Sequence, residues 1–328
     1  MTIDRRRFNA MLMTGAAGAA LAPVARAETA WPTKPIRFVV PYTPGGFTDV
    51  MARLVAARLT ERLGQQVLIE NKPGANSIIG VDSVAKAPPD GYTFAVVIAA
   101  YAANTTLYPK LPYDPRKDLQ PVSLIGVSPL VAAVNLGTPF KDARSLVAYA
   151  KANPGKVSFG SSGNGSAAHL TTELLKATTG TYMVHIPYRG AAPALTDLTG
   201  GHIQLFLDAA SGLIAPGKAG KVRLIGTTGE KRLPALPDLP TFAEQGIANF
   251  SGSTWAGVLA PAGTPKDIVQ RMAGEITRIV RSEELRGRFE ELGTFPGGGT
   301  PEEFERFVNA ETEKWGQVIK RAGITAER

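Results

Sequence analysis

The stretch IRFVVPYTPGGFTD, residues 36–49, decides the fold. Its first part, Ile36–Pro41, is apolar and rich in β-branched residues, which predicts a buried β-strand. The pair Gly45-Gly46 ends the strand, and beyond it apolar residues recur at three- and four-residue spacing: Met51, Leu54, Val55, Leu59 and Leu63. This spacing predicts a helix with one buried face. The stretch is therefore a strand, a glycine-rich loop and a helix.

The middle of the chain repeats this arrangement in VSFGSSGNGSAAHL, residues 157–170. A short strand, Val157–Phe159, runs into a loop rich in glycine and serine, and a helix follows. Two strand–loop–helix units of the same design predict two lobes of similar architecture.

Short apolar runs alternate with amphipathic segments along the rest of the chain, which predicts an α/β protein with a largely parallel sheet. The remaining predicted strands are Val67–Glu70, Phe94–Ile98, Val122–Val127, Val131–Asn135, Met183–Ile186, Ile203–Leu207, Val222–Gly226 and Val258–Ala260. Further helices are predicted around Ile268–Val280 and Phe304–Ile319, where Met and aromatic residues at helical spacing are expected to pack in the core.

The N-terminus predicts export. Arg5–Arg7 precede a short Ala/Gly-rich apolar stretch, and Ala25-Arg26-Ala27 fits a signal-peptidase site, so residues 1–27 are predicted to be a cleaved signal peptide. Arg5-Arg6-Arg7-Phe8 fits a twin-arginine signal, and an ordinary secretory signal is the alternative. The sequence has no cysteine, which excludes a lipid-modified N-terminal cysteine and thiolate chemistry. We expect a periplasmic protein that is soluble and not a lipoprotein.

The net charge of +8 is weak evidence for an anionic partner such as nucleic acid, because the first 27 residues contribute +3 of it. The remaining Lys and Arg residues are scattered, and no basic run interleaves with aromatic residues. This pattern predicts no nucleic-acid partner and indicates a mildly basic surface that attracts anions.

The two glycine-rich loops carry the predicted chemistry. A helix N-terminus presents N–H groups without intrahelical partners, and these suit a carboxylate or phosphate. Gly45 and Gly46 allow the main chain to approach such a guest, although an ordinary strand-to-helix turn has the same sequence. Asp49 is expected to orient the loop, because a carboxylate beside a bound anion would repel it.

The second loop combines glycines with hydroxyl groups that can solvate an anion, while Ser166 also suits a plain helix N-cap. His169 follows about one helical turn later, where a packing or capping role is an open alternative. His185 and His202 lack partners at metal-ligand spacing, so no metal is predicted. Asp208 ends a predicted strand, at the position where open α/β sheets bind ligands.

Ordered motifs along the mature chain resemble the substrate-binding component of tripartite tricarboxylate transporters, a family that includes the Bordetella uptake proteins. They include Trp31-Pro32, Val40-Pro41-Tyr42-x-Pro44-Gly45-Gly46-x-x-Asp49, Glu70-Asn71-Lys72-Pro73-Gly74-Ala75, Asp90-Gly91-Tyr92-Thr93, Ser161-x-Gly163-x-Gly165-Ser166-x-x-His169-Leu170 and Pro187-Tyr188-Arg189-Gly190.

The resemblance implies a type II periplasmic-binding-protein fold, with two α/β lobes and a ligand cleft between them. Lobe I is then residues 28–127 plus 254–328, and lobe II is residues 128–253. The implied ligand-binding residues are Tyr42, Pro44, Gly45, Gly46, Phe47, Asp49, Ala100, Tyr101, Ser162, Gly163, Gly165, Ser166, His169 and Asp208. The implied guest is a small organic carboxylate, such as a dicarboxylate, a tricarboxylate, an acidic amino acid or an aromatic acid. The implied partner is a membrane permease, and we expect a monomer without cofactors.

Two other functions fit parts of the sequence. The same fold serves a carboxylate sensor or carrier that feeds a signalling receptor. A secreted hydrolase would use Ser162, His169 and Asp208, which have the residue types of a catalytic triad. However, the loop lacks the Gly-x-Ser-x-Gly nucleophile elbow, so no enzyme activity and no catalytic residue are predicted.

Overall fold

The computed structural model describes residues 31–326, and the predicted signal peptide lies outside them. The strands are β1 (Ile36–Val40), β2 (Val67–Asn71), β3 (Thr93–Val97), β4 (Leu119–Val134), β5 (Ser158–Ser161), β6 (Val184–Pro187), β7 (Leu205–Ala209), β8 (Arg223–Thr227), β9 (Ser253–Pro261) and β10 (Phe295–Pro296). The helices are α2 (Phe47–Leu63), α3 (Ile78–Ala85), α4 (Ala99–Leu107), α5 (Ala143–Ala152), α6 (Ala167–Thr179), α7 (Ala191–Gly200), α8 (Ala210–Lys218), α9 (Lys266–Val280), α10 (Glu283–Glu291) and α11 (Pro301–Ala322). None of the described helices is long and apolar enough to cross a bilayer.

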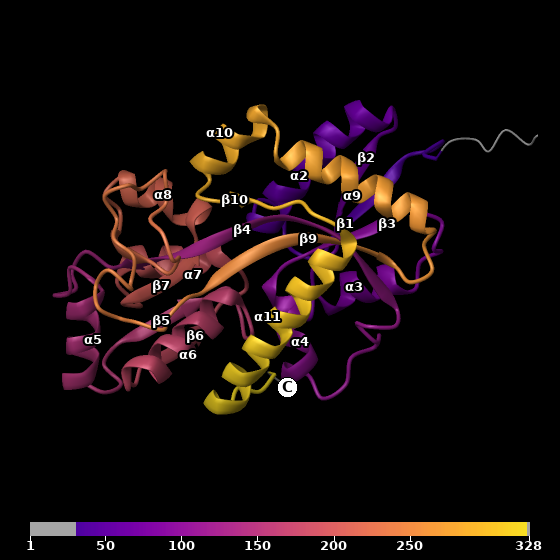
Figure 1. Ribbon diagram of the computed structural model, residues 1–328. Helices are drawn as coiled ribbons and strands as arrows, with labels where there is room; N and C mark the ends of the chain where they lie inside the picture. The colour runs from indigo at the N-terminus through magenta and orange to yellow at the C-terminus, as the bar shows by residue number, and fades with distance from the viewer. Residues whose placement is uncertain (1–30, 327–328) are drawn as a thin grey trace, which may run out of the picture.

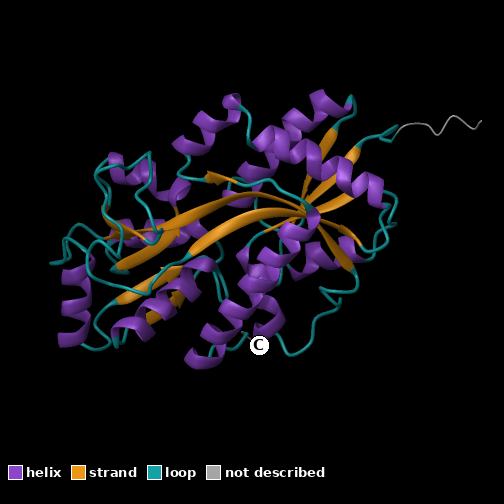
Figure 2. Cartoon of the chain, in the orientation of Figure 1, coloured by secondary structure: helices purple, strands orange, loops and turns teal. Residues whose placement is uncertain are grey.

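The strands form two halves that share the long strand β4 (Figures 1 and 2). In the first half the parallel strands β2, β1 and β3 are followed by β9 and β4, which are antiparallel to their neighbours. In the second half β4 pairs antiparallel with β7 and β8, and β7, β5 and β6 run parallel. The prediction of a largely parallel sheet is therefore wrong for the centre of the molecule, where the strands pair antiparallel.

The two predicted strands Val122–Val127 and Val131–Asn135 are one strand, β4. The residues between the two predicted strands include Pro129, which has no N–H for a ladder. In the structure Pro129 lies where the ladder with β9 ends, opposite Ser253, and the ladder with β7 begins at Leu130. Pro129 therefore lies at the junction of the two ladders, and β4 crosses from one half to the other. The short strand β10, which pairs with β4, was not predicted.

Helices cover both faces of the sheet. In the first half, alternate residues of β1 and β3 face α2 and α9 in one apolar cluster and face α3, α4 and α11 in another. In the second half, α7 and α8 pack on one face and α5 on the other. The predicted buried faces of α2, α9 and α11 are confirmed: Met51, Leu59, Met272, Ile276 and Trp315 are fully buried.

The C-terminal helix α11 packs against both halves. Leu170 of α6, in the second half, packs with Leu107 of α4 and with Trp315 of α11 in one apolar cluster. The buried Glu311 on α11 accepts hydrogen bonds from the indole N–H groups of Trp255 on β9 (3.0 Å) and Trp315 (2.8 Å). Figure 1 shows α11 starting near the end of β9 in the first half and running below β4 and β9, past α4 and towards α6.

Candidate ligand-binding site

The first glycine-rich loop joins the carboxyl end of β1 to α2 (Figure 1). Gly45 has a left-handed backbone, with φ of +82°, which favours glycine. The Asp49 carboxylate accepts a hydrogen bond from the Gly45 N–H, and Arg53 and Asn71 also donate to it, each bond being 2.9 Å long. Asp49 is buried, so its side chain holds the loop together from behind.

The Asp49 carboxylate keeps its charge in this environment. Burial alone would raise its pKa, but the hydrogen bonds from Arg53, the Gly45 N–H and Asn71 outweigh burial and hold the pKa below its ordinary value. This agrees with the expectation that Asp49 orients the loop.

The amides that follow Gly45 are available to a guest. Among the described residues, the N–H groups of Gly46, Phe47 and Thr48 have no hydrogen-bond acceptor. Pro44 and Gly46 are exposed and Phe47 is half-buried. The loop therefore offers main-chain donors at the positive end of α2 and no cationic side chain from its own residues.

The segment Ala75–Ser77 forms a strained wall beside this loop. Its three residues have φ of 45°, 48° and 78°, which non-glycine residues rarely adopt. Asn76 and Asn104 hold the segment: each side-chain N–H₂ donates at 2.8 Å, one to the Asn104 side-chain oxygen and the other to the Asn76 carbonyl. Tyr42 lies next to Ser77, and burial raises the Tyr42 pKa well above its ordinary value. Backbone strain held in this way is typical of functional sites.

The first turn of α4 lies next in space, because β3 pairs with β1. Ala100 and Tyr101 lie in this turn, directly after Ala99, and are buried. The Tyr101 hydroxyl donates to the Pro115 carbonyl at 3.1 Å, and its ring belongs to the hydrophobic core. The structure thus gives Tyr101 a packing role, and we leave it out of the proposed site.

The second glycine-rich loop joins β5 to α6 and is built around the Ser161 hydroxyl. This buried group accepts a hydrogen bond from the Gly163 N–H (3.2 Å), donates to the Gly163 carbonyl (3.0 Å) and lies 2.6 Å from His185 Nε2. The backbone of Gly163 is left-handed, with φ of +132°. Ser162 and Gly163 are half-buried.

The start of α6 completes this loop. Ser166 is the N-cap, and its hydroxyl accepts from the His169 N–H at 3.3 Å. His169 Nδ1 in turn accepts from the Gly165 N–H at 3.1 Å. The N–H groups of Asn164 and Ala167 have no acceptor in the part of the chain that the structure describes. The second loop therefore also presents free main-chain donors at a helix start.

The two halves meet at Gly165. A Cβ atom on this residue would lie 2.4 Å from Leu107 Cδ2 and 3.1 Å from Asn76 Nδ2, both in the first half of the protein. Gly165 also has a left-handed φ of +74°. The second loop is thus in contact with the wall, Ala75–Ser77, that borders the first loop.

Asp208 lies near the carboxyl end of β7, where the sequence places it, and retains some exposed surface. Protein atoms nevertheless surround its carboxyl group: burial raises its pKa to about 7, opposed by a hydrogen bond from the Ala209 N–H. Near neutral pH a substantial share of this carboxyl is therefore protonated, which weakens its repulsion for an anion.

We predict that Asp208→Asn stabilises the protein only at higher pH. An unfolded Asp ionises near pH 4, so the wild type loses stability as pH rises from about 4 to 7, whereas the neutral Asn does not. The free energy of unfolding of the variant should equal that of the wild type near pH 4 and exceed it by about 2 kcal/mol at pH 8. This value allows for solvent screening, because Asp208 is partly exposed. Urea unfolding at both pH values measures this difference, and an equal difference at the two values would contradict it.

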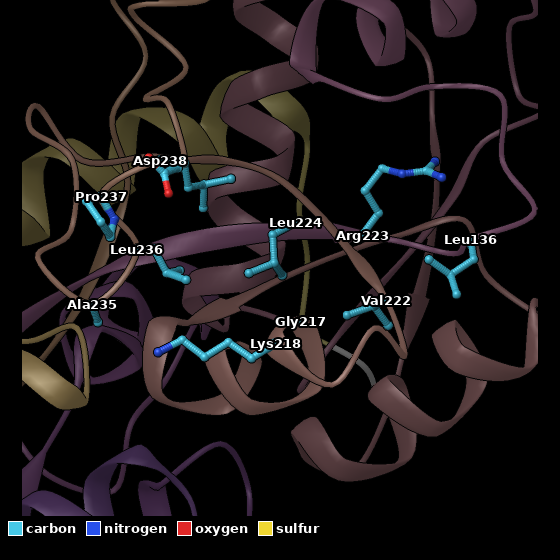
Figure 3. A pocket seen from close by; sticks show the side chains of 11 residues that line it. Leu136, Gly217, Lys218, Val222, Arg223, Leu224, Ala235, Leu236, Pro237 and Asp238 are labelled. Atoms are coloured by element: carbon cyan, nitrogen blue, oxygen red, sulfur yellow. The ribbon is translucent and has the colours of Figure 1, made fainter.

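Two cavities lie away from these loops. One, of about 530 Å³, is lined by Leu136, by residues of α8 and β8, and by the loop Ala235–Leu239. Figure 3 shows Lys218 and Asp238 among its lining side chains. The other, of about 460 Å³, lies between α6 and α11. Neither cavity is lined by a residue of the predicted site.

The contacts of the serine and histidine residues do not build a hydrolytic triad. Ser166 caps the helix that carries His169, and the hydroxyl of Ser161 beside His185 is fully buried and bonded to Gly163. Among residues 31–326, Glu173 lies 3.9 Å from His169 Nε2, too far for the hydrogen bond by which an acid orients a catalytic base. No cluster of three metal-ligating side chains occurs between residues 31 and 326.

The sequence analysis did not identify Asn76 and His185 as residues of the site. Asn76 directly follows the motif at residues 70–75, and His185 lies just before the motif at residues 187–190. Both act through long-range contacts, with Asn104 and Ser161 respectively. Their signal in the sequence was their position next to these motifs.

Two α/β halves that share long antiparallel strands, with a glycine-rich loop at the start of a helix in each half, define a two-lobed solute-binding protein. Residues 51–324 match the tripartite tricarboxylate transporter family receptor, and the chain belongs to this family. The predicted fold class and family are thus confirmed.

Several relatives resemble the chain over most of its length. The protein BugT of Bordetella pertussis is 35% identical over 98% of this chain and 99% of its own. The structure of Rpa4515 of R. palustris with adipate is 39% identical, covers 90% of this chain and 99% of its own, and superposes with a TM-score of 0.86. MatC of Rhodopseudomonas palustris with bound malate is 30% identical, covers 88% of this chain and 100% of its own, and has a TM-score of 0.80.

Proposed function

We propose that this protein is a periplasmic receptor that captures a small dicarboxylate between its two halves and delivers it to the membrane permease of a tripartite tricarboxylate-type transporter. The observation that carries the proposal is the contact of Gly165 with Asn76 and Leu107, which brings the second glycine-rich loop to the wall of the first. Relatives with adipate and with malate support a carboxylate guest.

Free amides at the starts of α2 and α6 suit a guest that carries a carboxylate at each end. Main-chain donors bind such groups without a full opposing charge, which favours release as well as capture. The proposed site comprises Tyr42, Pro44, Gly45, Gly46, Phe47, Asp49, Ala100, Ser162, Gly163, Gly165, Ser166 and Asp208.

The proposal includes movement of two lobes, residues 28–127 plus 254–328 and residues 128–253, about the strands that cross between them. Val127–Pro129 of β4 pair with Ser253–Trp255 of β9, so both crossings lie in one ladder. Hinge closure of this kind shifts the open–closed population when the closed form contacts the guest better. We further propose export by the signal at residues 1–27, a monomeric state and no catalytic turnover.

A binding experiment tests this function. We expect adipate or malate, titrated into the mature protein in a calorimeter, to bind at one site per chain. The acid should be recovered chemically unchanged. At 100 times its dissociation constant, the bound acid should stabilise the folded state by about 2.7 kcal/mol. The uncharged analogues adipamide and malamide are the matched controls and should not bind. If the amides bind as well as the acids, or if no organic acid of a C4–C6 panel binds, the proposal is wrong.

A further inference from the structure

Two histidines from different elements, the buried His169 and the half-buried His185, stack face to face behind the second glycine-rich loop. The rings of His169 on α6 and His185 on β6 lie 3.8 Å apart with an interplanar angle of 9°. Phe159 of β5 packs against both rings, with its centroid 4.9 Å from that of His185 and 6.3 Å from that of His169. Since β6 pairs with β5, these contacts join the loop, its preceding strand and its following helix into one packed unit.

The hydrogen bonds of the pair fix one tautomer for each ring. His169 Nδ1 accepts from the Gly165 N–H, so this ring carries its proton on Nε2. The Ser161 hydroxyl has one proton; with the Gly163 carbonyl as its acceptor, His185 Nε2–H is the donor in the 2.6 Å contact, and we assign His185 this tautomer. Each neutral imidazole therefore holds one glycine turn of the loop.

The surroundings keep both rings neutral. The charged groups facing the pair are Glu173 and Lys176 on α6, which form an ion pair of 2.7 Å with each other. Burial is the main cause that lowers the pKa of His169 to about 3 and that of His185 to about 4, and Lys176 adds to it. A proton on His169 Nδ1 would remove the acceptor of the Gly165 amide.

We propose that His169 and His185 are positioning residues that set the shape of the carboxylate-binding loop, and that neither imidazole binds the guest itself. This inference rests on the proposed function and changes the role of His169, which the resemblance places among ligand-binding residues. His169 sets the turn at Gly165, the residue in contact with the first half, and His185 sets the turn at Gly163 through Ser161.

Asparagine and glutamine substitutions separate positioning from packing. The amide end of Asn falls where His has Nδ1, and that of Gln falls where His has Nε2. His169→Asn therefore keeps the acceptor for Gly165 and His169→Gln removes it. At the second position the order reverses, because His185→Gln keeps a donor for Ser161 and His185→Asn does not.

We expect adipate and malate to bind His169→Asn and His185→Gln within about threefold of wild type, and His169→Gln and His185→Asn at least tenfold more weakly, the cost of one unsatisfied buried group. Amide hydrogen exchange of Gly165 should accelerate in His169→Gln alone. In the wild type, ¹⁵N shifts should show both rings as neutral Nε2–H tautomers from pH 5 to 8.

The outcomes keep this inference apart from the proposed function. If the wild type binds neither acid, the proposed binding of adipate or malate is contradicted. The hydrogen-exchange rate of Gly165 and the ¹⁵N shifts still test the positioning roles of the two histidines. If the wild type binds and the four variants bind alike, or lose affinity in the order of side-chain size, the inference is wrong. Direct contact with the guest would instead weaken both variants at position 169 equally.

Discussion

Replacing Gly165 with valine should weaken adipate or malate binding about 100-fold, which corresponds to about 2.7 kcal/mol. The added Cβ would lie 2.4 Å from Leu107 Cδ2 and 3.1 Å from Asn76 Nδ2. Leu107 is only 3% exposed, so it has little room to move aside. The side chain would therefore push the second loop away from the first half and prevent closure. Calorimetric titration measures the loss.

Gly180→Val is the matched control for this prediction. Gly180 also has a left-handed backbone, with φ of +63°, but no atom lies within 4 Å of its Cβ position at the end of α6. Both substitutions should cost about 1–2 kcal/mol of folding stability through backbone strain. Only Gly165→Val should lose affinity, and equal affinities for the two variants would show that the contact at Gly165 does not govern binding.

Asp49→Ala should destabilise the fold by about 2–4 kcal/mol and abolish measurable binding. The change removes the buried carboxylate that accepts hydrogen bonds from the Gly45 N–H and the Asn71 side chain, so the loop loses its acceptor. Asp49→Asn should retain part of the stability, because an amide oxygen can accept one of these bonds. Arg53→Ala should cost less than 1 kcal/mol, since the Arg53 side chain is 52% exposed. Urea unfolding with calorimetry measures both effects.

The pH dependence of the same residue checks its role. Because the pKa of Asp49 is lowered in the folded protein, its contribution is complete above the unfolded value near pH 4 and declines as the pH falls below it. The stability difference between wild type and Asp49→Asn should therefore shrink below pH 4. A difference that stays constant down to pH 2 would mean that the ionised carboxylate does not hold the loop.

Local sequence patterns were sufficient to predict the parts of the site that depend on neighbouring residues. The apolar strand, the glycines and the helical spacing around Gly45 and Gly163 lie within short stretches, and the structure has strands and helices there. The predicted loop-orienting role of Asp49 and the N-cap Ser166 likewise depend on residues three or four positions away.

Contacts between distant residues could not be predicted in this way. Nothing in the sequence indicates that Ser161 meets His185, that Asn76 meets Asn104, or that Pro129 lies where one ladder gives way to another. The packing of individual glycines was equally hidden: a Cβ on Gly45 would meet no atom within 4 Å, whereas one on Gly165 would collide with Leu107.

A crystal structure of the mature protein grown with adipate or malate tests the convergence of both loops on one guest most directly. We predict that one carboxylate of the guest accepts hydrogen bonds from the amides of residues 46–48 and the other from the amides of Asn164 and Ala167 in the second loop. An acid bound in the cavity between α6 and α11, or held by one loop with its far end in solvent, would contradict this account.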